Sequence, residues 1–440
     1  MNFKKFFELA ASRGINEAQI FVSKSESTSI TLFHHEIDAY KINNSQSVVA
    51  LGIYNGKLGS GMTEKLGDGT FEFLVNQIIL TATYSEKPNE IGIFKGSEKY
   101  KKKCFFNKEL ALVPIEKKIA DLRALENAIY AYDPRITDAD HVTYSERASS
   151  MDLYNSYGLK LSRKSNYYYF VAGAIARDGD ETKTFYDIHF DSDYSTFKVD
   201  ELCKKVCDKA LAKFGGKPCK AGKYPTVLHK SVVGSLLGYF VSSCIADEVQ
   251  RHSSFLEGKL HTKIASSKLT IEERPLEKGL FYSYFDDEGV ACKNKFVLKR
   301  GVLENYFYNR ETAHKDGVES TGNGSWGGSK FSTSPGPLFV KPGKVDFNTM
   351  IAPIKKGVYI TEIAGLGTGM NPSSGDFSCQ AEGYMIEDGK VTTPLNLITL
   401  SGNLFKMIKE IKALDNDAKL DESGMSVPNF YIKSMSIGGE

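Results

Sequence analysis

The sequence lacks an excess of charge of either sign. Lysine and arginine number 56 and aspartate and glutamate number 54 in the 440-residue chain, which leaves a formal net charge of +2. A balance this close gives no general attraction to nucleic acid or to an anionic membrane surface, so we expect neither as a direct partner. Apolar residues make up 41% and charged residues 25% of the chain, which is typical of a soluble globular protein.

Cysteine is too sparse for a disulfide framework. An odd, scattered set in a chain this long predicts reduced thiols in a cytoplasmic protein. Cys203 and Cys207 lie one helical turn apart and could hold a metal ion or oxidise, but the apolar stripe beside them favours buried free thiols. The seven cysteines are Cys104, Cys203, Cys207, Cys219, Cys244, Cys292 and Cys379.

No long hydrophobic run is present. Residues 1–14 lack the apolar core of an export signal and have the spacing of an amphipathic helix instead. The longest uncharged stretch, residues 231–246, would span about 24 Å as a helix, whereas a bilayer core is about 30 Å thick. We therefore predict a buried helix there.

Turn and helix signals divide the first half of the chain into elements. Apolar residues at helical spacing predict helices near residues 71–82, 114–132 and 199–210, while residues 29–40 and 141–190 read as strands. Asn55-Gly56 between two apolar runs predicts a β-hairpin, because both turn residues must accept positive φ.

Two glycines and a proline within residues 214–218 predict a domain boundary. The fold class is then α+β, with an N-terminal α/β domain over residues 1–215 that contains an antiparallel-rich sheet. Residues 216–440 combine many short strands with few helices, which predicts a barrel-like β domain. We expect hairpins at residues 286–289 and 387–390 and a helix over Leu404–Leu414.

Histidines give no metal-binding pattern. None of the eight pairs with another at the i, i+3 or i+4 spacing that places two imidazoles on one helix face. His252 and His261, with Glu248 and Glu257 nearby, could form a carboxylate–imidazole site, but exposed loop histidines are the favoured interpretation. The adjacent pair His34-His35 lies in a predicted strand, so its side chains should point to opposite faces and cannot share one ion.

Other catalytic patterns are also missing. The chain has no Gly-x-Ser-x-Gly elbow, and the glycine-rich residues 321–328 carry no phosphate-loop lysine. Small residues in this loop, beside the single tryptophan Trp326, would permit close approach of a ligand backbone. The carboxylate pairs Glu272-Glu273 and Asp286-Asp287-Glu288 come with no evident apolar pocket, so we expect them at the solvated surface.

Several motifs of the second half together resemble one known family. They are GVYITEIAGLGTG at residues 357–369, SGDFS at 374–378, AEGYMIEDGK at 381–390 and TLSGNL at 399–404. With NSYG at residues 155–158 and the segment from Pro225 onward, they resemble the TldD/PmbA family over nearly the whole chain. The resemblance implies an N-terminal α/β domain and a C-terminal barrel-like domain. Members are named as modulators of DNA gyrase and as metallopeptidases.

The family is known in two kinds. The TldD kind holds a metal with His-Glu-x-x-x-His, in the helix after the domain boundary, and a cysteine near the C terminus, whereas the PmbA kind, also called TldE, lacks these ligands. In this sequence Leu236–Ser243 contains neither histidine nor glutamate, and Asp415–Glu440 contains neither cysteine nor histidine. The resemblance therefore implies a PmbA-like subunit with no cofactor, no metal ligands and no catalytic residues of its own.

This resemblance implies a subunit that helps to enclose and process unfolded peptides. Its partner would be a metal-bearing TldD-like paralogue in a heterodimer, or a second copy in a homodimer. A non-enzymatic regulator that binds gyrase or an antitoxin is the alternative, and a homodimer with its own hydrolytic activity ranks last. We expect small residues of two loops to line the peptide cavity: Thr321, Gly322, Asn323, Gly324, Trp326, Gly375, Asp376 and Ser378.

Overall fold

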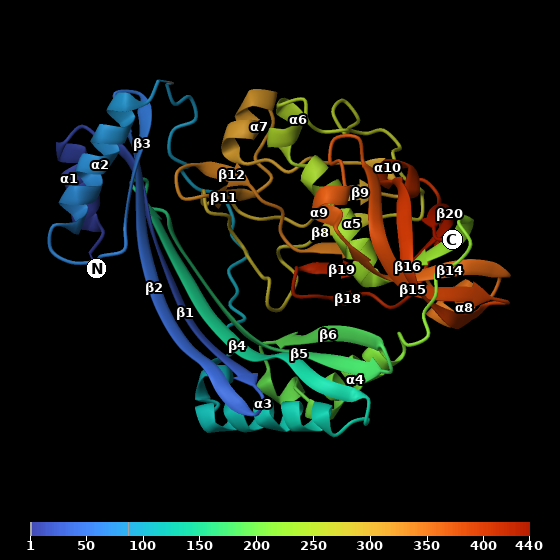
Figure 1. Ribbon diagram of the computed structural model, residues 1–440. Helices are drawn as coiled ribbons and strands as arrows, with labels where there is room; N and C mark the ends of the chain where they lie inside the picture. Colours follow the sequence, from blue (N-terminus) through green and yellow to red (C-terminus); the bar gives the residue numbers. More distant parts are fainter. Residues whose placement is uncertain (1, 87) are drawn as a thin grey trace.

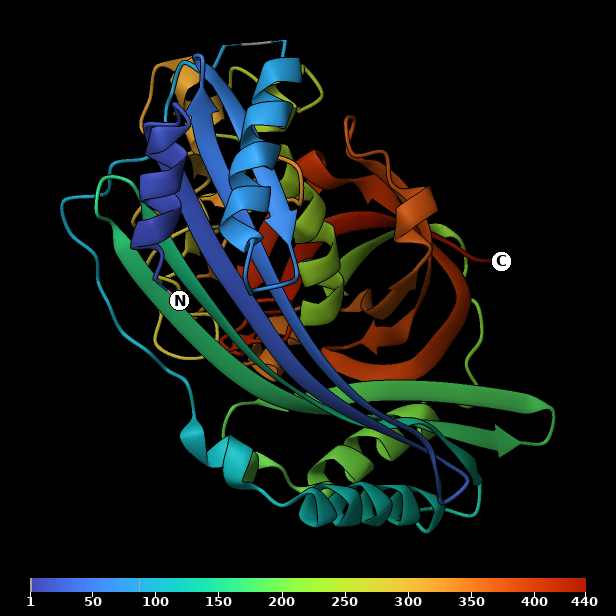
Figure 2. The same ribbon diagram turned by 90° about the vertical axis from the view of Figure 1, so that its left-hand side faces the viewer.

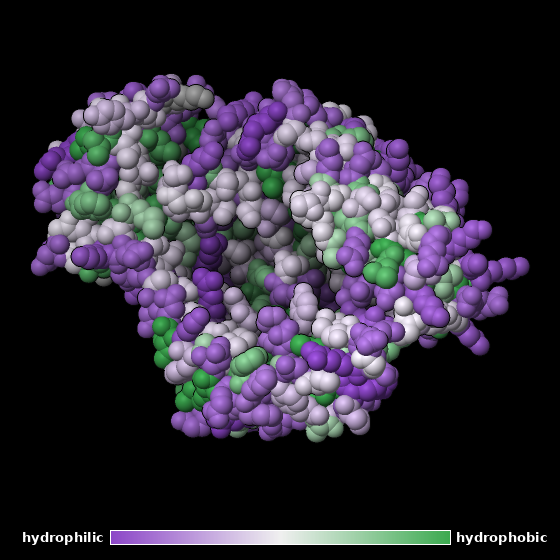
Figure 3. Space-filling model, in the orientation of Figure 1, coloured by the Kyte–Doolittle hydropathy of each residue, from purple (hydrophilic) through white to green (hydrophobic). Residues whose placement is uncertain are grey.

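A computed structural model describes residues 2–86 and 88–440 of the chain. One long, curved antiparallel sheet forms the N-terminal half, and a closed β-barrel with attached small elements forms the C-terminal half (Figure 1). The two halves face each other across a central hollow, which Figure 3 shows in space-filling form. The α+β class expected from the sequence is confirmed.

The long sheet, here called sheet A, has six strands in the order β3–β2–β1–β4–β5–β6. Its strands are β1 (Glu17–Phe33), β2 (Glu36–Tyr54), β3 (Lys57–Thr63), β4 (Ile136–Asn155), β5 (Lys160–Asp178) and β6 (Glu181–Asp191). The predicted hairpin turn is confirmed at Asn55 and Gly56, which have φ angles of 49° and 72°. Tight turns of this kind fix the register of consecutive strands, so residues far apart in sequence meet across the sheet.

The turn between β1 and β2 corrects the expected strand over residues 29–40. His34 and His35 are turn residues with φ angles of 51° and 69°, not strand residues. His34 approaches Asp138 at 3.7 Å and His35 approaches Glu126 at 3.4 Å. The sequence argument was therefore wrong about the backbone, although each imidazole does lie beside a different carboxylate.

The two faces of sheet A have different neighbours. Helices cover one face, here called the outer face: α1 (Lys4–Ser12) and α2 (Thr70–Tyr84) at one end, α3 (Ile115–Tyr130) and α4 (Val199–Leu211) at the other (Figure 2). Alternate residues along each strand point to the inner face, which is turned toward the C-terminal half. The three helices predicted for residues 71–82, 114–132 and 199–210 are confirmed.

A five-stranded barrel forms the core of the C-terminal half. Its strands are β7 (Gly222–Leu228), β14 (Lys356–Ala364), β15 (Asp376–Glu387), β16 (Lys390–Asn403) and β20 (Phe430–Gly438). Strand order runs β16–β15–β14–β7–β20, and pairing between β16 and β20 closes the ring. The expected barrel-like architecture is confirmed, as is the hairpin at residues 387–390.

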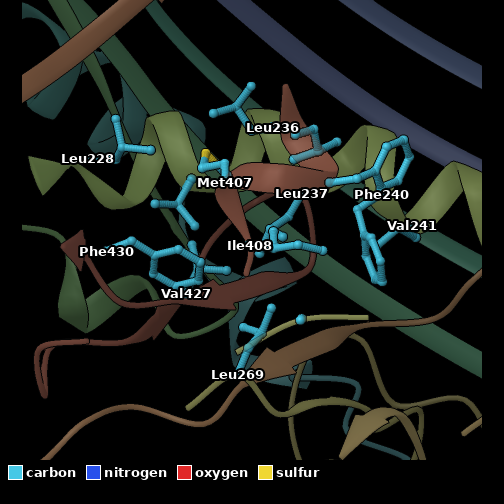
Figure 4. Close-up of a cluster of buried hydrophobic side chains, with 14 of the residues drawn as sticks. Leu228, Leu236, Leu237, Phe240, Val241, Leu269, Met407, Ile408, Val427 and Phe430 are labelled. Carbon is cyan, nitrogen blue, oxygen red and sulfur yellow. The ribbon is translucent and has the colours of Figure 1, made fainter. Parts of the chain in front are cut away.

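Helix α5 (Lys230–Ser243) packs against the barrel, which confirms the buried helix predicted for the longest uncharged stretch. Figure 4 shows apolar side chains of this helix, among them Leu236 and Phe240, beside Ile408 and Phe430 from other parts of the chain. The helix expected over Leu404–Leu414 is wrong. Only α10 (Leu404–Met407) is helical, and β17 (Ile411–Leu414) is a strand because it pairs with β20.

Smaller elements complete the C-terminal half. They are the sheet strands β8 (Ile271–Glu273), β9 (Lys295–Lys299), β10 (Val302–Leu303), β13 (Leu338–Val340), β18 (Lys419–Leu420) and β19 (Met425–Val427), the hairpin β11 (Gly324–Trp326) and β12 (Phe331–Thr333), and the helices α6 (Ala246–Gln250), α7 (Arg310–Asp316), α8 (Phe347–Ile351) and α9 (Leu366–Gly369). No helix in residues 2–86 and 88–440 is long and apolar enough to cross a membrane.

Candidate functional site

A cleft of about 670 Å³ lies between the inner face of sheet A and the C-terminal half. Strands β1, β2, β4 and β5 form its floor, and residues 280–283 with Asp287 and Trp326 form its opposite wall. This position, between two bodies of structure, is where ligand pockets commonly occur. The cleft is therefore the candidate functional site.

Serines dominate the floor of this cleft, in rows that cross the sheet. Ser45 of β2 pairs with Ser25 of β1, which pairs with Ser149 of β4, which in turn pairs with Ser165 of β5. The hydroxyls of Ser149 and Ser165 are 3.0 Å apart. Because serine is small and polar, such a row leaves room above the sheet and presents both donors and acceptors to a ligand.

Toward the hairpin β11–β12, the floor becomes apolar. Phe21 of β1 packs with Leu153, Leu161 and Phe285 in one buried cluster that joins the two halves. The indole ring of Trp326 lies 6.0 Å from the ring of Phe21, centroid to centroid, in an edge-on arrangement. Contacts of this type hold one end of the cleft closed.

The turn Asp286–Glu288 anchors the wall, and its burial overturns the expected surface location. Asp286 and Glu288 are 5% and 3% exposed. Asp286 accepts hydrogen bonds from the backbone N–H groups of Glu288, Val290 and Gly324 at 2.8–3.0 Å. Burial raises the pKa of Asp286 to about 7 and that of Glu288 to about 8. The sequence interpretation failed because the apolar surroundings come from distant segments.

Glu273, the second residue of the other carboxylate pair, is also fully buried. Its carboxylate forms an ion pair with Lys295 and accepts a hydrogen bond of 2.6 Å from the Asn323 amide. Glu272 is partly exposed and pairs with Arg274 at 2.8 Å. The expected surface location is therefore wrong for Glu273 as well, because a buried carboxylate needs such partners.

These carboxylates fix the loop at residues 321–326 that the sequence singled out. Asn323 is buried, and its side-chain amide donates a hydrogen bond to the carboxylate of Glu273. Gly324 lies against the side chain of Glu288, with no room for a Cβ. The backbone N–H of Trp326 donates to Asp287 at 2.9 Å. Of the eight residues expected to line a peptide cavity, Trp326 is the one that lines this cleft.

The other predicted loop lies at the start of β15. Asp376 accepts hydrogen bonds from Asn403 and Ser374 at 2.8 Å, and Ser378 lies 2.9 Å from Ser401 across the strand pair. Gly375 has a φ of 76° and is pressed against the ring of Phe405. These contacts give the loop a structural role, and peptide binding by Gly375, Asp376 and Ser378 stays a prediction.

Arg163 of β5 connects the floor of the cleft to its wall. Its guanidinium donates to Ser283 Oγ, to the Phe285 carbonyl and to Asp287 Oδ1, at 3.1, 2.9 and 2.6 Å. It also lies over the ring of Phe285, 5.0 Å from the centroid. All of these partners belong to the C-terminal half, so Arg163 links the two halves directly.

We expect Arg163→Met to lower the free energy of unfolding by about 2 kcal/mol, because Asp287 loses its charged partner. Urea unfolding followed by circular dichroism measures this loss. The matched control is Arg123→Met, at an exposed position on α3, which should change stability by less than about 0.5 kcal/mol. Equal stability of the two variants would contradict the linking role of Arg163.

Side chains that could ligate a metal do not converge. Among residues 2–86 and 88–440, no group of three or more His, Cys, Asp or Glu side chains could hold a metal ion. His252 pairs with Glu257 at 2.7 Å, whereas His261 lies 3.8 Å from Glu304, so the two imidazoles belong to separate exposed ion pairs. Cys203 and Cys207 are buried free thiols, as expected.

Helix α5 carries no metal ligand on its accessible side. The residues that the barrel leaves at least partly accessible are Lys230, Ser231, Gly234, Ser235, Gly238, Tyr239 and Ser242. None of them offers the imidazole, thiolate or carboxylate that zinc requires. The residues present therefore do not fit a zinc site on this helix.

Sequence reasoning missed the serine rows on sheet A. Their trace in the sequence is the alternation Ser23-x-Ser25-x-Ser27 and Ser45-x-Ser47, the period of a strand with one small polar face. The alternation alone could not predict the cleft, because it gives no information that the C-terminal half covers the inner face of the sheet.

Two family profiles match the chain. The profile described as "PmbA/TldA metallopeptidase C-terminal domain" matches residues 221–439, and the one described as "PmbA/TldA metallopeptidase central domain" matches residues 108–214. Together the matches cover nearly all of the C-terminal half and about half of the N-terminal half.

Curated relatives match over nearly their full lengths. A protein named Metalloprotease PmbA homolog from Buchnera aphidicola (subsp. Acyrthosiphon pisum) is 27% identical over 429 residues, which is 93% of this chain and 90% of that protein. Metalloprotease PmbA from Escherichia coli O157:H7 is 24% identical over 440 residues, 98% of this chain and 94% of the relative.

Solved structures share the whole fold. A Thermotoga maritima protein, named as a candidate modulator of a DNA gyrase, superposes with a TM-score of 0.92 at 27% identity and covers 99% of both chains. TldE from Thermococcus kodakarensis superposes with a TM-score of 0.90, covering 99% of this chain and 100% of its own. Identity to TldE is 19%, so that likeness concerns the fold alone.

Proposed function

The chain belongs to the PmbA/TldD family, and we propose that it is a metal-free subunit of a metallopeptidase complex. In this role it encloses unfolded peptides, while a partner with its own metal site cleaves them. The observation that carries the proposal is helix α5, whose accessible side presents lysine, serine, glycine and tyrosine and no metal ligand.

Zinc chemistry explains why this observation matters. A catalytic zinc needs three protein ligands from histidine, cysteine, aspartate or glutamate, with one coordination position left open for water. The accessible side of α5 supplies none, and the chain after Leu414 contains no cysteine or histidine. Cleavage would therefore depend on a second polypeptide that carries His-Glu-x-x-x-His.

The serine-rich cleft supports a peptide-holding role. Hydroxyls that both donate and accept hydrogen bonds can pair with the backbone of a peptide of any sequence. The floor belongs to sheet A and the wall to the C-terminal half, so a peptide in the cleft would contact both halves of the subunit.

A metal-bearing paralogue is the proposed partner, in a heterodimer located in the cytoplasm. The location is an expectation from the seven cysteines, all of which are free in the structure. A homodimer would enclose a peptide in the same way but would have no metal ligands on either α5.

The test measures metal content and peptidase activity of the purified chain, alone and with a His-Glu-x-x-x-His paralogue of the same organism. We expect the chain alone to bind no stoichiometric zinc and to leave an unfolded peptide intact. The mixture should cleave the peptide, and a chelator should stop the cleavage. The paralogue alone is the control for what the subunit adds.

Two outcomes would overturn the proposal. Stoichiometric zinc and cleavage by the single chain would mean that it holds a complete site. Unchanged activity of the paralogue when this chain is added would remove its role as a subunit. In the second case, the names of the gyrase-related neighbours favour a regulator, which predicts a direct, metal-independent complex with gyrase.

A further inference from the structure

We propose that the cleft on sheet A selects peptides that carry a carboxylate, and that the guanidinium of Arg147 binds this group. The inference rests on the proposed function, because it names the class of peptide that the enclosed cleft would take. Arg147 lies on β4 and lines the cleft.

The guanidinium of Arg147 is held in place but is not neutralised. Its Nε donates a hydrogen bond of 2.9 Å to the hydroxyl of Ser25. No aspartate or glutamate within residues 2–86 and 88–440 forms an ion pair with it. Its two terminal nitrogens thus remain available as a planar fork, which matches the two oxygens of a carboxylate.

Arg163 provides the contrast within the same cleft. Its terminal nitrogens already donate to Ser283, Phe285 and Asp287. Arg163 is therefore a structural cation, whereas Arg147 is the guanidinium of the cleft without an anionic partner among the described residues.

An unpaired cation on the inner face favours an anion. Arg147 and Arg163 point to this face, whereas Lys24 and Lys164 lie between inner-face residues of their strands and point to the outer face. Asp287 already pairs with Arg163, and Glu64, which also lines the cleft, forms no ion pair with Arg147. A partly enclosed space weakens screening by water, so the charge of Arg147 attracts an anion more strongly here than it would on an open surface.

Serine hydroxyls lie beside the guanidinium of Arg147. The row that contains Ser25 and Ser149 lies next to Arg147 on the inner face, and Ser149 contacts Ser165. A carboxylate oxygen that is not bound by the guanidinium could accept hydrogen bonds from these hydroxyls. Such bonds would replace those that the carboxylate loses to water when it enters the cleft.

The length of the inner face favours a peptide over a small anion. A second hollow of about 500 Å³ lies farther along β5, lined by Tyr169, Val171, Gly173 and Tyr186 among others. From Ser165 to Gly173 the strand extends about 26 Å, at about 3.3 Å per residue. A chain of several residues can reach both hollows, with its carboxylate at Arg147 and an apolar side chain beside the tyrosines.

Fluorescence of Trp326 can test this proposal, because it is the single tryptophan of the chain and it lines the cleft. One unstructured peptide without acidic residues would be titrated in three forms. These have a free C terminus, an amidated C terminus, and an amidated C terminus with one internal glutamate. Isothermal calorimetry provides a second readout of binding.

We expect a carboxylate-bearing form to bind about tenfold more tightly than the neutral amide, the size of one charge-assisted contact. Arg147→Gln should remove this difference, and Arg123→Gln, at an exposed position on α3, should keep it. Added salt should weaken the carboxylate form more than the amide. Because Arg147 is exposed, its replacement should leave the circular dichroism spectrum unchanged.

The forms of the peptide distinguish the two sources of a carboxylate. Preference for the free C terminus assigns recognition to the chain end, and preference for the internal glutamate assigns it to an acidic side chain. Equal binding of all three forms would overturn the carboxylate inference and leave the proposed subunit role intact. Preference that persists in Arg147→Gln would overturn the assignment to this residue, and no binding of any form would overturn both the inference and the peptide-holding role.

Discussion

Replacing Gly383 with alanine should destabilise the barrel by about 3 kcal/mol or more. A Cβ at this position would overlap the carbonyl oxygen of Tyr359 and lie 2.9 Å from Cα of Ile360 on the neighbouring strand. Both are backbone atoms of β14, which cannot move away without breaking the strand pairing. The close approach arises at irregularities of register on both sides of Gly383, where β15 meets β14 and β16.

Urea unfolding of Gly383→Ala, followed by far-ultraviolet circular dichroism, measures this effect. The matched control is Gly238→Ala on α5, where a Cβ would meet no heavy atom within 4 Å. Alanine should stabilise that helix by up to about 1 kcal/mol. A loss below about 1 kcal/mol for Gly383→Ala would contradict the close packing of β14 on β15.

The second large effect concerns pH. We expect the protein to lose stability as the pH rises from about 4.5 to 8, through the buried carboxyl of Glu288. Burial first, and the negative charge of Asp286 second, raise the pKa of Glu288 from 4.5 to about 8. Between these values the folded state keeps a proton that the unfolded state has released, so raising the pH favours unfolding.

The size of this effect follows from the two pKa values of Glu288. One pKa unit corresponds to about 1.4 kcal/mol, so a carboxyl whose pKa is raised this far is expected to have a measurable effect on the free energy of unfolding across this range. It is fully present below about pH 4.5 and lost once the pH passes the folded-state pKa. Charged groups that act on Glu288 are Asp286 and Glu311, which oppose its ionisation, and Arg310, which favours it.

Glu288→Gln removes the titration of Glu288 and leaves that of Asp286. The amide oxygen can still accept the hydrogen bond of 2.8 Å from the Arg310 backbone N–H, but the side chain no longer titrates. Urea unfolding at pH 5 and pH 8 should give a smaller difference for Glu288→Gln than for the wild type. Glu319→Gln, at an exposed position, should behave like the wild type, and a parallel pH dependence of Glu288→Gln would contradict the prediction.

The carboxylates at residues 286–288 link this pH dependence to the cleft. Asp287 pairs with Arg163 on sheet A, and Asp286 holds the backbone of Gly324 in the cleft wall. Tyr100, in the segment between α2 and α3, donates to the carbonyl of Gly289 at 2.7 Å. Loosening of this turn at high pH would therefore alter the wall of the cleft as well as the stability of the chain.

The sequence by itself determined the local elements and the class of fold. The residues Asn55 and Gly56 determine the first-half hairpin because both accept positive φ, and apolar spacing determines helices α2, α3 and α4. Local composition is sufficient in these cases, since the energy that decides them comes from residues close together in the chain. The resemblance of the C-terminal motifs to the TldD/PmbA family was likewise readable, because the motifs are contiguous.

Tertiary contacts decided the elements that the sequence argument got wrong. Ile411–Leu414 has a helical pattern but becomes a strand, because pairing with β20 stabilises it more than its own turn would. Carboxylate side chains usually lie at the surface, but segments distant in sequence bury Glu273, Asp286 and Glu288 and supply their hydrogen-bond partners. A local sequence pattern cannot predict contacts with residues that are distant in the chain.

The candidate site belongs to this second group. Alternating serines are visible in β1 and β2, but the rows form only when β4 and β5 pair beside them in register. The unpaired guanidinium of Arg147 can act as a binding group only because the C-terminal half covers the inner face of sheet A and leaves a cleft there. Sequence determined which side chains were available, and long-range packing decided which of them meet, since burial and electrostatic environment depend on distance in space.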